Sequence, residues 1–118
     1  MIIVSNVVIS LIGLIHLYIL VLEMFLWYKP YGLRAFGQSL ETATASKVLA
    51  ANQGLYNGFM AAGLFWALAL GTNGAGVKVF FLTCILIAGV YGAITANKKI
   101  LFIQAIPAAI ALALLYFS

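Results

Sequence analysis

Residues 2–27 read IIVSNVVISLIGLIHLYILVLEMFLW, an almost unbroken apolar run. A run of this length can cross a bilayer as an α-helix, which needs about 20 mainly apolar residues. Because backbone polar groups cannot stay unpaired in lipid, a helix is the expected conformation. Two ionisable side chains, His16 and Glu23, lie inside this run, so it bears on both the fold and the function.

The composition assigns the whole chain to the same class. Of its 118 residues, 66% are hydrophobic and 7% are charged, whereas soluble domains carry about 25% charged residues. A chain this short buries only about 60–70% of its unfolded surface, which leaves much apolar surface for lipid. Further apolar runs cover residues 47–70, 77–96 and 100–117. We therefore predict one all-α domain over residues 1–118, an integral membrane four-helix bundle.

The basic side chains predict the orientation of these helices. Five of the six Lys and Arg residues flank the first and third connections, namely Lys29, Arg34, Lys47, Lys98 and Lys99. Only Lys78 borders the second connection. The positive-inside rule then places the first and third connections in the cytoplasm and both termini outside. Topology thus explains the net charge of +4, and we expect the lipid bilayer, and no nucleic acid, as a partner.

Glu23 and His16 are the polar side chains of the first run that matter most. They lie seven residues apart, about two helical turns, and so project from nearly the same face. A carboxylate costs at least about 2.5 kcal/mol at the centre of a bilayer, so such groups face the bundle interior or a water-filled cavity. Glu23 therefore needs a partner inside the bundle.

Amide side chains of the second run lie at a matching depth. With a rise of about 1.5 Å per residue, Glu23 lies about 6 Å in from Trp27, and Asn52 and Gln53 about 8 Å in from Lys47. We predict that Glu23 faces inward within hydrogen-bond reach of Asn52 or Gln53, directly or through one water. The same depth argument places His16 level with Asn57 in a second, more central layer. The full set of candidate site residues is Glu23, His16, Asn52, Gln53, Asn57, Tyr56, Gln104, Tyr91 and Trp27.

Small residues recur at four-residue spacing on the second, third and fourth helices. In lipid such stripes let helix backbones approach closely. The predicted packing residues are Gly54, Gly58, Ala62 and Gly92. Thr44 or Ser46 is expected to cap the second helix, and Pro107 is expected to bend the fourth.

Two stretches resemble a known family. LEMFLWYKPYGLRAFG at residues 22–37 and AANQGLYNGFMAAGLFWAL at residues 50–68 resemble the small four-helix integral membrane proteins catalogued as domain of unknown function 1304. The most specific part is NQGLYNG at residues 52–58, preceded by Glu23, Trp27 and Pro30. The resemblance covers essentially the whole chain and implies a multi-pass, mainly bacterial protein without an established activity. We therefore expect the protein to be located in the cytoplasmic membrane of a bacterium.

Three functions stay open on this evidence. The first is proton-linked transport of a small or amphipathic ligand, with protons exchanged at Glu23 and His16 as a second titrating group. The second is a membrane-embedded enzyme, such as an isomerase, that uses Glu23 in acid–base chemistry on a lipid-soluble substrate. The third is a structural or accessory subunit, because intramembrane amides and histidines also bond helices together.

Neither a cofactor nor a metal is expected. His16 and Glu23 lack the further strong ligand that a metal site needs.

The strong bias of Lys and Arg toward the first and third connections means that any homo-oligomer would be parallel.

Overall fold

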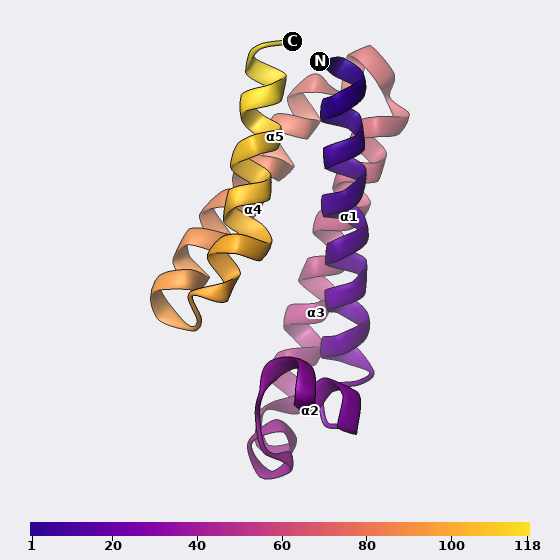
Figure 1. The fold of residues 1–118 in the computed structure, drawn as a ribbon. Helices are drawn as coiled ribbons and strands as arrows, with labels where there is room; N and C mark the ends of the chain where they lie inside the picture. Colours follow the sequence, from indigo (N-terminus) through magenta and orange to yellow (C-terminus); the bar gives the residue numbers. More distant parts are fainter. The chain divides into compact units, whose positions relative to one another are not determined.

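The structure of the chain, a computed structural model that describes residues 1–118, is helical and contains no strand. Its elements are α1 (Ile2–Met24), α2 (Pro30–Phe36), α3 (Leu40–Ala69), the 3₁₀ helix η1 (Gly71–Gly74), α4 (Ala75–Thr95), the π-helix η2 (Leu101–Ala105) and α5 (Ile106–Tyr116) (Figure 1). The predicted all-α class is confirmed, with five α-helices where four were expected. The chain divides into two compact units. We call Met1–Gly13 with Ala62–Ser118 the terminal unit and Leu14–Ala61 the central unit.

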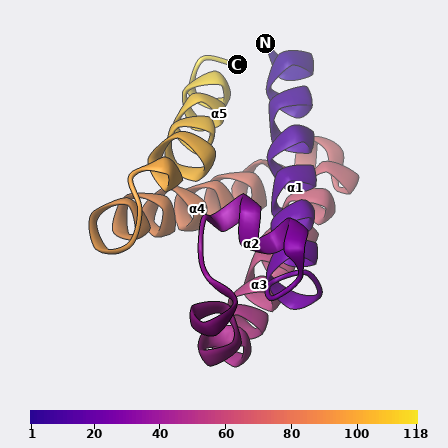
Figure 2. The same cartoon turned by 60° about the horizontal axis from the view of Figure 1, so that its bottom comes forward.

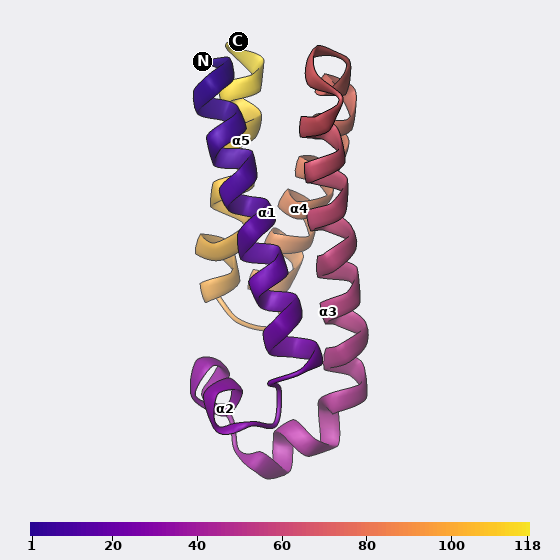
Figure 3. The ribbon, with the colours of Figure 1, turned by 90° about the vertical axis from the view of Figure 1, so that its right-hand side faces the viewer.

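In the central unit, α1 and α3 run antiparallel and side by side (Figures 1 and 3). Within this unit, the buried positions of α3 are Ala43, Ala50, Gly54, Asn57 and Ala61. Their spacings of seven, four, three and four residues follow one face of a helix with 3.6 residues per turn. Ala62 is exposed, so it is not among the residues that α3 buries, and its packing role stays a prediction. A strict four-residue spacing drifts by about 40° per step, and by Ala62 it has left the face that α3 buries.

Helix α3 begins at Leu40, seven residues before the predicted start. Its first turn is capped by Ser39, whose Oγ accepts a hydrogen bond from the Thr42 backbone N–H at 3.2 Å. Ser39 satisfies one of the backbone donors that a helix start leaves unpaired. Thr44 and Ser46, the predicted caps, instead lie inside the helix. The apolar run marks only the later part of α3, and the more polar residues 40–46 continue the same helix before it.

The predicted connection between the first two spanning runs contains the short helix α2. Pro30 occupies its first turn, where the missing N–H does no harm. Gly37 ends it in the left-handed conformation with φ 60°, which glycine adopts without strain. Figure 2 shows α2 beside the C-terminal end of α1, and the Phe36 ring contacts the Trp27 ring there, with centroids 4.7 Å apart.

In the terminal unit, α4 packs against η2 and α5. A Cβ on Gly89 would lie 2.6 Å from the Ala105 backbone nitrogen, so the two backbones touch here. Pro107 is in the first turn of α5, directly after η2. Proline cannot donate to the carbonyl four residues earlier, and the segment directly before it is π-helical. The bend expected at Pro107 stays a prediction. The two chain termini lie at the same end of this unit (Figure 1).

Two segments are long and apolar enough to cross a membrane, Ile2–Met24 and Gly71–Thr95, while the apolar segment Leu101–Tyr116 is shorter. Helix α3, with 30 residues, is longer than either. It does not meet the same criterion of hydropathy, because Asn52, Gln53 and Asn57 lie in its otherwise apolar half.

Candidate functional site

The central unit contains a buried carboxylate–amide pair. Asn57 of α3 donates from Nδ2 to Oε1 of Glu23 at the end of α1, over 2.6 Å. Both side chains are nearly enclosed, with Glu23 4% and Asn57 9% exposed. The donor is a neutral amide rather than a basic side chain, so the pair holds no compensating positive charge. An amide can donate to a carboxylate and, through its own oxygen, accept from a carboxylic acid.

Glu23 lies inward, as predicted. Its hydrogen-bond partner in the structure, however, is Asn57 rather than Asn52 or Gln53. Asn52 and Gln53 are exposed, and the amide bonded to Glu23 is Asn57. Side chains on a helix lean toward its N-terminus. Because α1 and α3 are antiparallel, Glu23 and Asn57 lean toward each other, which closes the difference in depth inferred from their backbone positions. Asn52 and Gln53, in turn, lie away from the buried face that Gly54 and Asn57 share.

Two glycines bring α3 against α1 beside this pair. A Cβ on Gly54 would lie 3.0 Å from the Glu23 Cβ and 2.8 Å from the Met24 Cγ. A Cβ on Gly58 would lie 2.5 Å from the Leu20 Cδ1. Glycine at both positions therefore permits a close approach of the two helices. This approach encloses the Glu23 carboxyl.

The other predicted site residues of the central unit, His16, Trp27 and Tyr56, differ in burial and in the contacts they make. His16 is fully buried, on the same face of α1 as Glu23. Trp27 donates from Nε1 to the Ser46 Oγ at 3.1 Å, which ties the end of α1 to the first half of α3. Tyr18 of α1 and Tyr31 of α2 share a hydrogen bond between their hydroxyls. Tyr56 is exposed, and its ring packs edge-on against the neighbouring Phe59 ring, with centroids 5.9 Å apart.

The remaining predicted residues belong to the terminal unit. Tyr91 is exposed on α4. Gly92 faces Ile100 across the connection between α4 and η2, at 3.2 Å from its would-be Cβ. Gln104 is half-buried within η2. These three residues are part of a unit other than the one that contains Glu23.

Lys78, which the charge pattern of the sequence marks only as a topology residue, also makes a buried polar contact. Its side chain is 4% exposed, and its Nζ donates to Oδ1 of Asn6 at 2.8 Å. The signal in the sequence was its position one residue inside an apolar run. An ionisable residue there marks a functional-site candidate by the same reasoning that was applied to Glu23.

Fold and site together define an all-α protein with apolar helices and a carboxylate buried between two of them. The chain matches a family described as "Protein of unknown function (DUF1304)" over residues 10–116, and it therefore belongs to this family. This confirms the resemblance inferred from residues 22–37 and 50–68. A relative in Lactococcus lactis subsp. lactis, "Uncharacterized protein YpaA", is 33% identical over 96 residues, which cover 80% of this chain and 81% of the relative. No solved structure matches the chain.

Proposed function

We propose that the protein is a multi-pass protein of the cell membrane in which Glu23 exchanges protons during the transport of a small or amphipathic molecule. The observation that carries the proposal is the Glu23–Asn57 pair. A carboxyl group 4% exposed, inside an apolar helix, is bonded to a neutral amide. Such a group can lose and regain a proton without first breaking an ion pair.

The surface of the apolar helices supports a lipid environment. Only 33% of the apolar window in Ile2–Met24 and 22% of that in Gly71–Thr95 is buried, whereas the core helix of a soluble protein is mostly buried. Large apolar side chains point outward instead, including Ile3 at 75% and Ile94 at 79% exposure. Soluble monomers rarely expose contiguous apolar surface on this scale. Lipid is the solvent that would cover it.

In the proposed cycle, Asn57 serves both forms of Glu23. It donates from Nδ2 to the carboxylate, and after rotation of the amide its oxygen accepts from the protonated carboxyl. Neither form of the acid is then left without a hydrogen bond. A cationic amphiphile and a proton would compete for the same carboxylate, which is the basis of exchange.

Transport is tested with purified full-length protein in liposomes under an imposed pH gradient. Ethidium is the probe, because a deprotonated carboxyl attracts an amphipathic cation. We expect uptake above that of empty liposomes, and we expect Glu23→Gln to abolish it while Glu41→Gln, the exposed acid in the first turn of α3, retains it. Uptake by Glu23→Gln equal to that of the wild type would refute the role of Glu23.

A measurement without any substrate tests the proton step itself. Infrared difference spectra recorded across a pH titration should contain a carboxylic acid band that Glu23→Gln removes and Glu41→Gln leaves. If this band is present but ethidium uptake is absent, the proton site stands and the choice of a cationic substrate is wrong.

The close packing around the pair favours a second candidate, a structural or accessory subunit. Gly54 lies against Glu23, and Gly58 lies against Leu20, as expected if the hydrogen bond joins two helices permanently. In that case Glu23→Gln leaves every measurable flux unchanged, since a Gln–Asn bond joins the helices equally well. The infrared titration would then lack the Glu23 band.

A further inference from the structure

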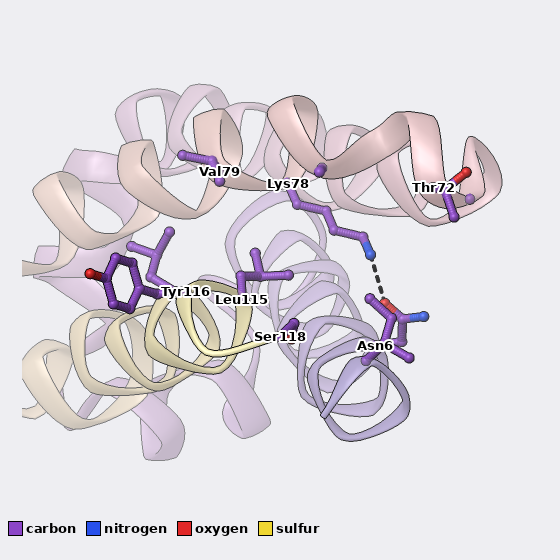
Figure 4. Close-up of a pocket in the computed structure, with 11 residues that line it drawn as sticks. Asn6, Thr72, Lys78, Val79, Leu115, Tyr116 and Ser118 are labelled. Carbon is purple, nitrogen blue, oxygen red and sulfur yellow. Dashed lines mark hydrogen bonds between the residues drawn. The ribbon is translucent and has the colours of Figure 1, made fainter.

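A second buried ionisable group lies in the terminal unit, beside a cavity of about 740 Å³. The cavity is lined by residues of α1, η1, α4 and α5, among them Asn6, Lys78, Val79, Leu112, Leu115 and Tyr116 (Figure 4). Its volume is within the range of about 300–1,000 Å³ that small-molecule sites occupy. The walls are mainly apolar, and Lys78 is the only charged side chain among the lining residues.

No acidic side chain of its own unit neutralises the Lys78 ammonium. It carries three N–H donors, and one of them reaches the Asn6 Oδ1 at 2.8 Å (Figure 4). The two acidic residues of the chain, Glu23 and Glu41, both belong to the central unit. A buried charge is stable only when it is paired and hydrogen-bonded. The amide oxygen of Asn6 holds the ammonium in place but supplies no negative charge.

Snorkelling, the usual behaviour of a lysine at the end of an apolar helix, does not describe Lys78. A snorkelling lysine lays its stem on apolar surface and extends its ammonium into water. Lys78 is 4% exposed and reaches across to Asn6 on α1 instead. Its charge is therefore directed into the protein, beside the cavity.

We propose that this cavity binds an amphipathic molecule with one anionic head group and an aliphatic tail. The head group would accept hydrogen bonds from Lys78, and the tail would lie against Val79, Leu112 and Leu115. A carboxylate and a lipid phosphate share this chemistry. The inference is independent of the proton exchange proposed for Glu23, which belongs to the other unit.

The experiment measures binding of two anionic probes, decanoate and phosphatidylglycerol, to the full-length protein in neutral detergent. Decanol and phosphatidylcholine are the matched probes without net charge. Lys78→Gln keeps a donor for Asn6 but removes the charge, and Lys98→Gln removes an exposed charge of the same unit. We expect Lys78→Gln to weaken binding of the anion at least about tenfold, because a hydrogen bond to a charged group usually contributes at least this much to affinity. Lys98→Gln and Lys78→Arg should bind nearly as the wild type does.

Each outcome of this binding experiment either supports the proposed anion site or overturns it. Preference for decanoate or for phosphatidylglycerol supports the proposal and identifies the source of the head group. Equal binding of charged and uncharged probes by the wild-type protein overturns it, and this comparison needs no variant to fold. Equal losses in Lys78→Gln and Lys98→Gln would also overturn it, because they would indicate attraction to net charge alone.

Discussion

Asn57 Nδ2 lies 2.6 Å from Glu23 Oε1, and this contact joins residues 34 positions apart in the chain. It connects the end of α1 to the middle of α3. The same contact encloses an acid in a chain that has only two acidic residues. Stability and function are therefore expected to respond differently to substitutions of the two partners.

Asn57→Leu should destabilise the protein by about 1–3 kcal/mol, because it leaves a buried carboxyl without its donor. Glu23→Gln should have a much smaller effect, since a glutamine can still accept from Asn57. The matched control is Asn52→Leu, whose side chain is exposed and whose replacement should change little. Thermal unfolding in detergent, followed by circular dichroism, measures all three. A larger loss for Asn52→Leu than for Asn57→Leu would contradict the observed pairing.

Gly54→Ala should destabilise the protein more than Gly58→Ala does. At Gly54 the new methyl group would meet the Glu23 Cβ, the Met24 Cγ and, at 3.3 Å, the Leu20 carbonyl oxygen, which cannot all move aside. At Gly58 the near atom is the flexible end of the Leu20 side chain, and alanine also favours the helix by about 1 kcal/mol. Overpacking of this kind costs about 1–3 kcal/mol.

The control for both glycines is Gly76→Ala in α4, where an added Cβ meets nothing within 4 Å. It should be neutral or stabilising. Gly58→Leu, by contrast, should sharply reduce the melting temperature. An unchanged melting temperature for Gly58→Leu would place this face of α3 away from α1.

Gly89→Ala should cost more than about 2 kcal/mol, since its Cβ would meet the backbone of Ala105 rather than a movable side chain. The expected consequence is a separation of α4 from η2. Ala88→Leu at the adjacent exposed position is the control and should leave the melting temperature nearly unchanged. Similar melting temperatures for the two variants would argue against close contact of these backbones.

Ser39→Ala should destabilise the start of α3 by about 1 kcal/mol, because the Thr42 N–H loses its acceptor. Thr44→Ala, one of the residues first expected to cap this helix, should have a smaller effect. Amide hydrogen exchange over residues 40–45 provides the readout. Faster exchange in the Thr44 variant alone would favour the original assignment.

The proposed topology has both termini outside and Lys29, Arg34, Lys98 and Lys99 in the cytoplasm. Single cysteines at Gly37 and Lys98, in a Cys84→Ser background, should react with an impermeant maleimide only after the membrane is permeabilised. Labelling of either position in intact cells would reverse the assigned orientation.

Several features of the protein follow from its local sequence. The apolar runs predict helices, because length and hydropathy decide which segments can leave water. The face of α1 that is buried could also be read directly, since Ser5, Ile9, His16 and Glu23 recur at helical spacing and are all buried. That Glu23 points inward follows from the energy of an ionised group in an apolar medium.

Which amide meets Glu23 was decided by the tertiary structure alone. Asn52, Gln53 and Asn57 are the same kind of donor within six positions, and depth along the helix did not separate them correctly. Gly54 lets α3 pack closely against α1, and the opposed lean of side chains on antiparallel helices brings Asn57 to the carboxyl. Lys78 shows the same limit, because its contact with Asn6 joins residues 72 positions apart. Composition determines the medium a helix prefers, whereas the rotation of one packed helix against another determines which polar groups meet.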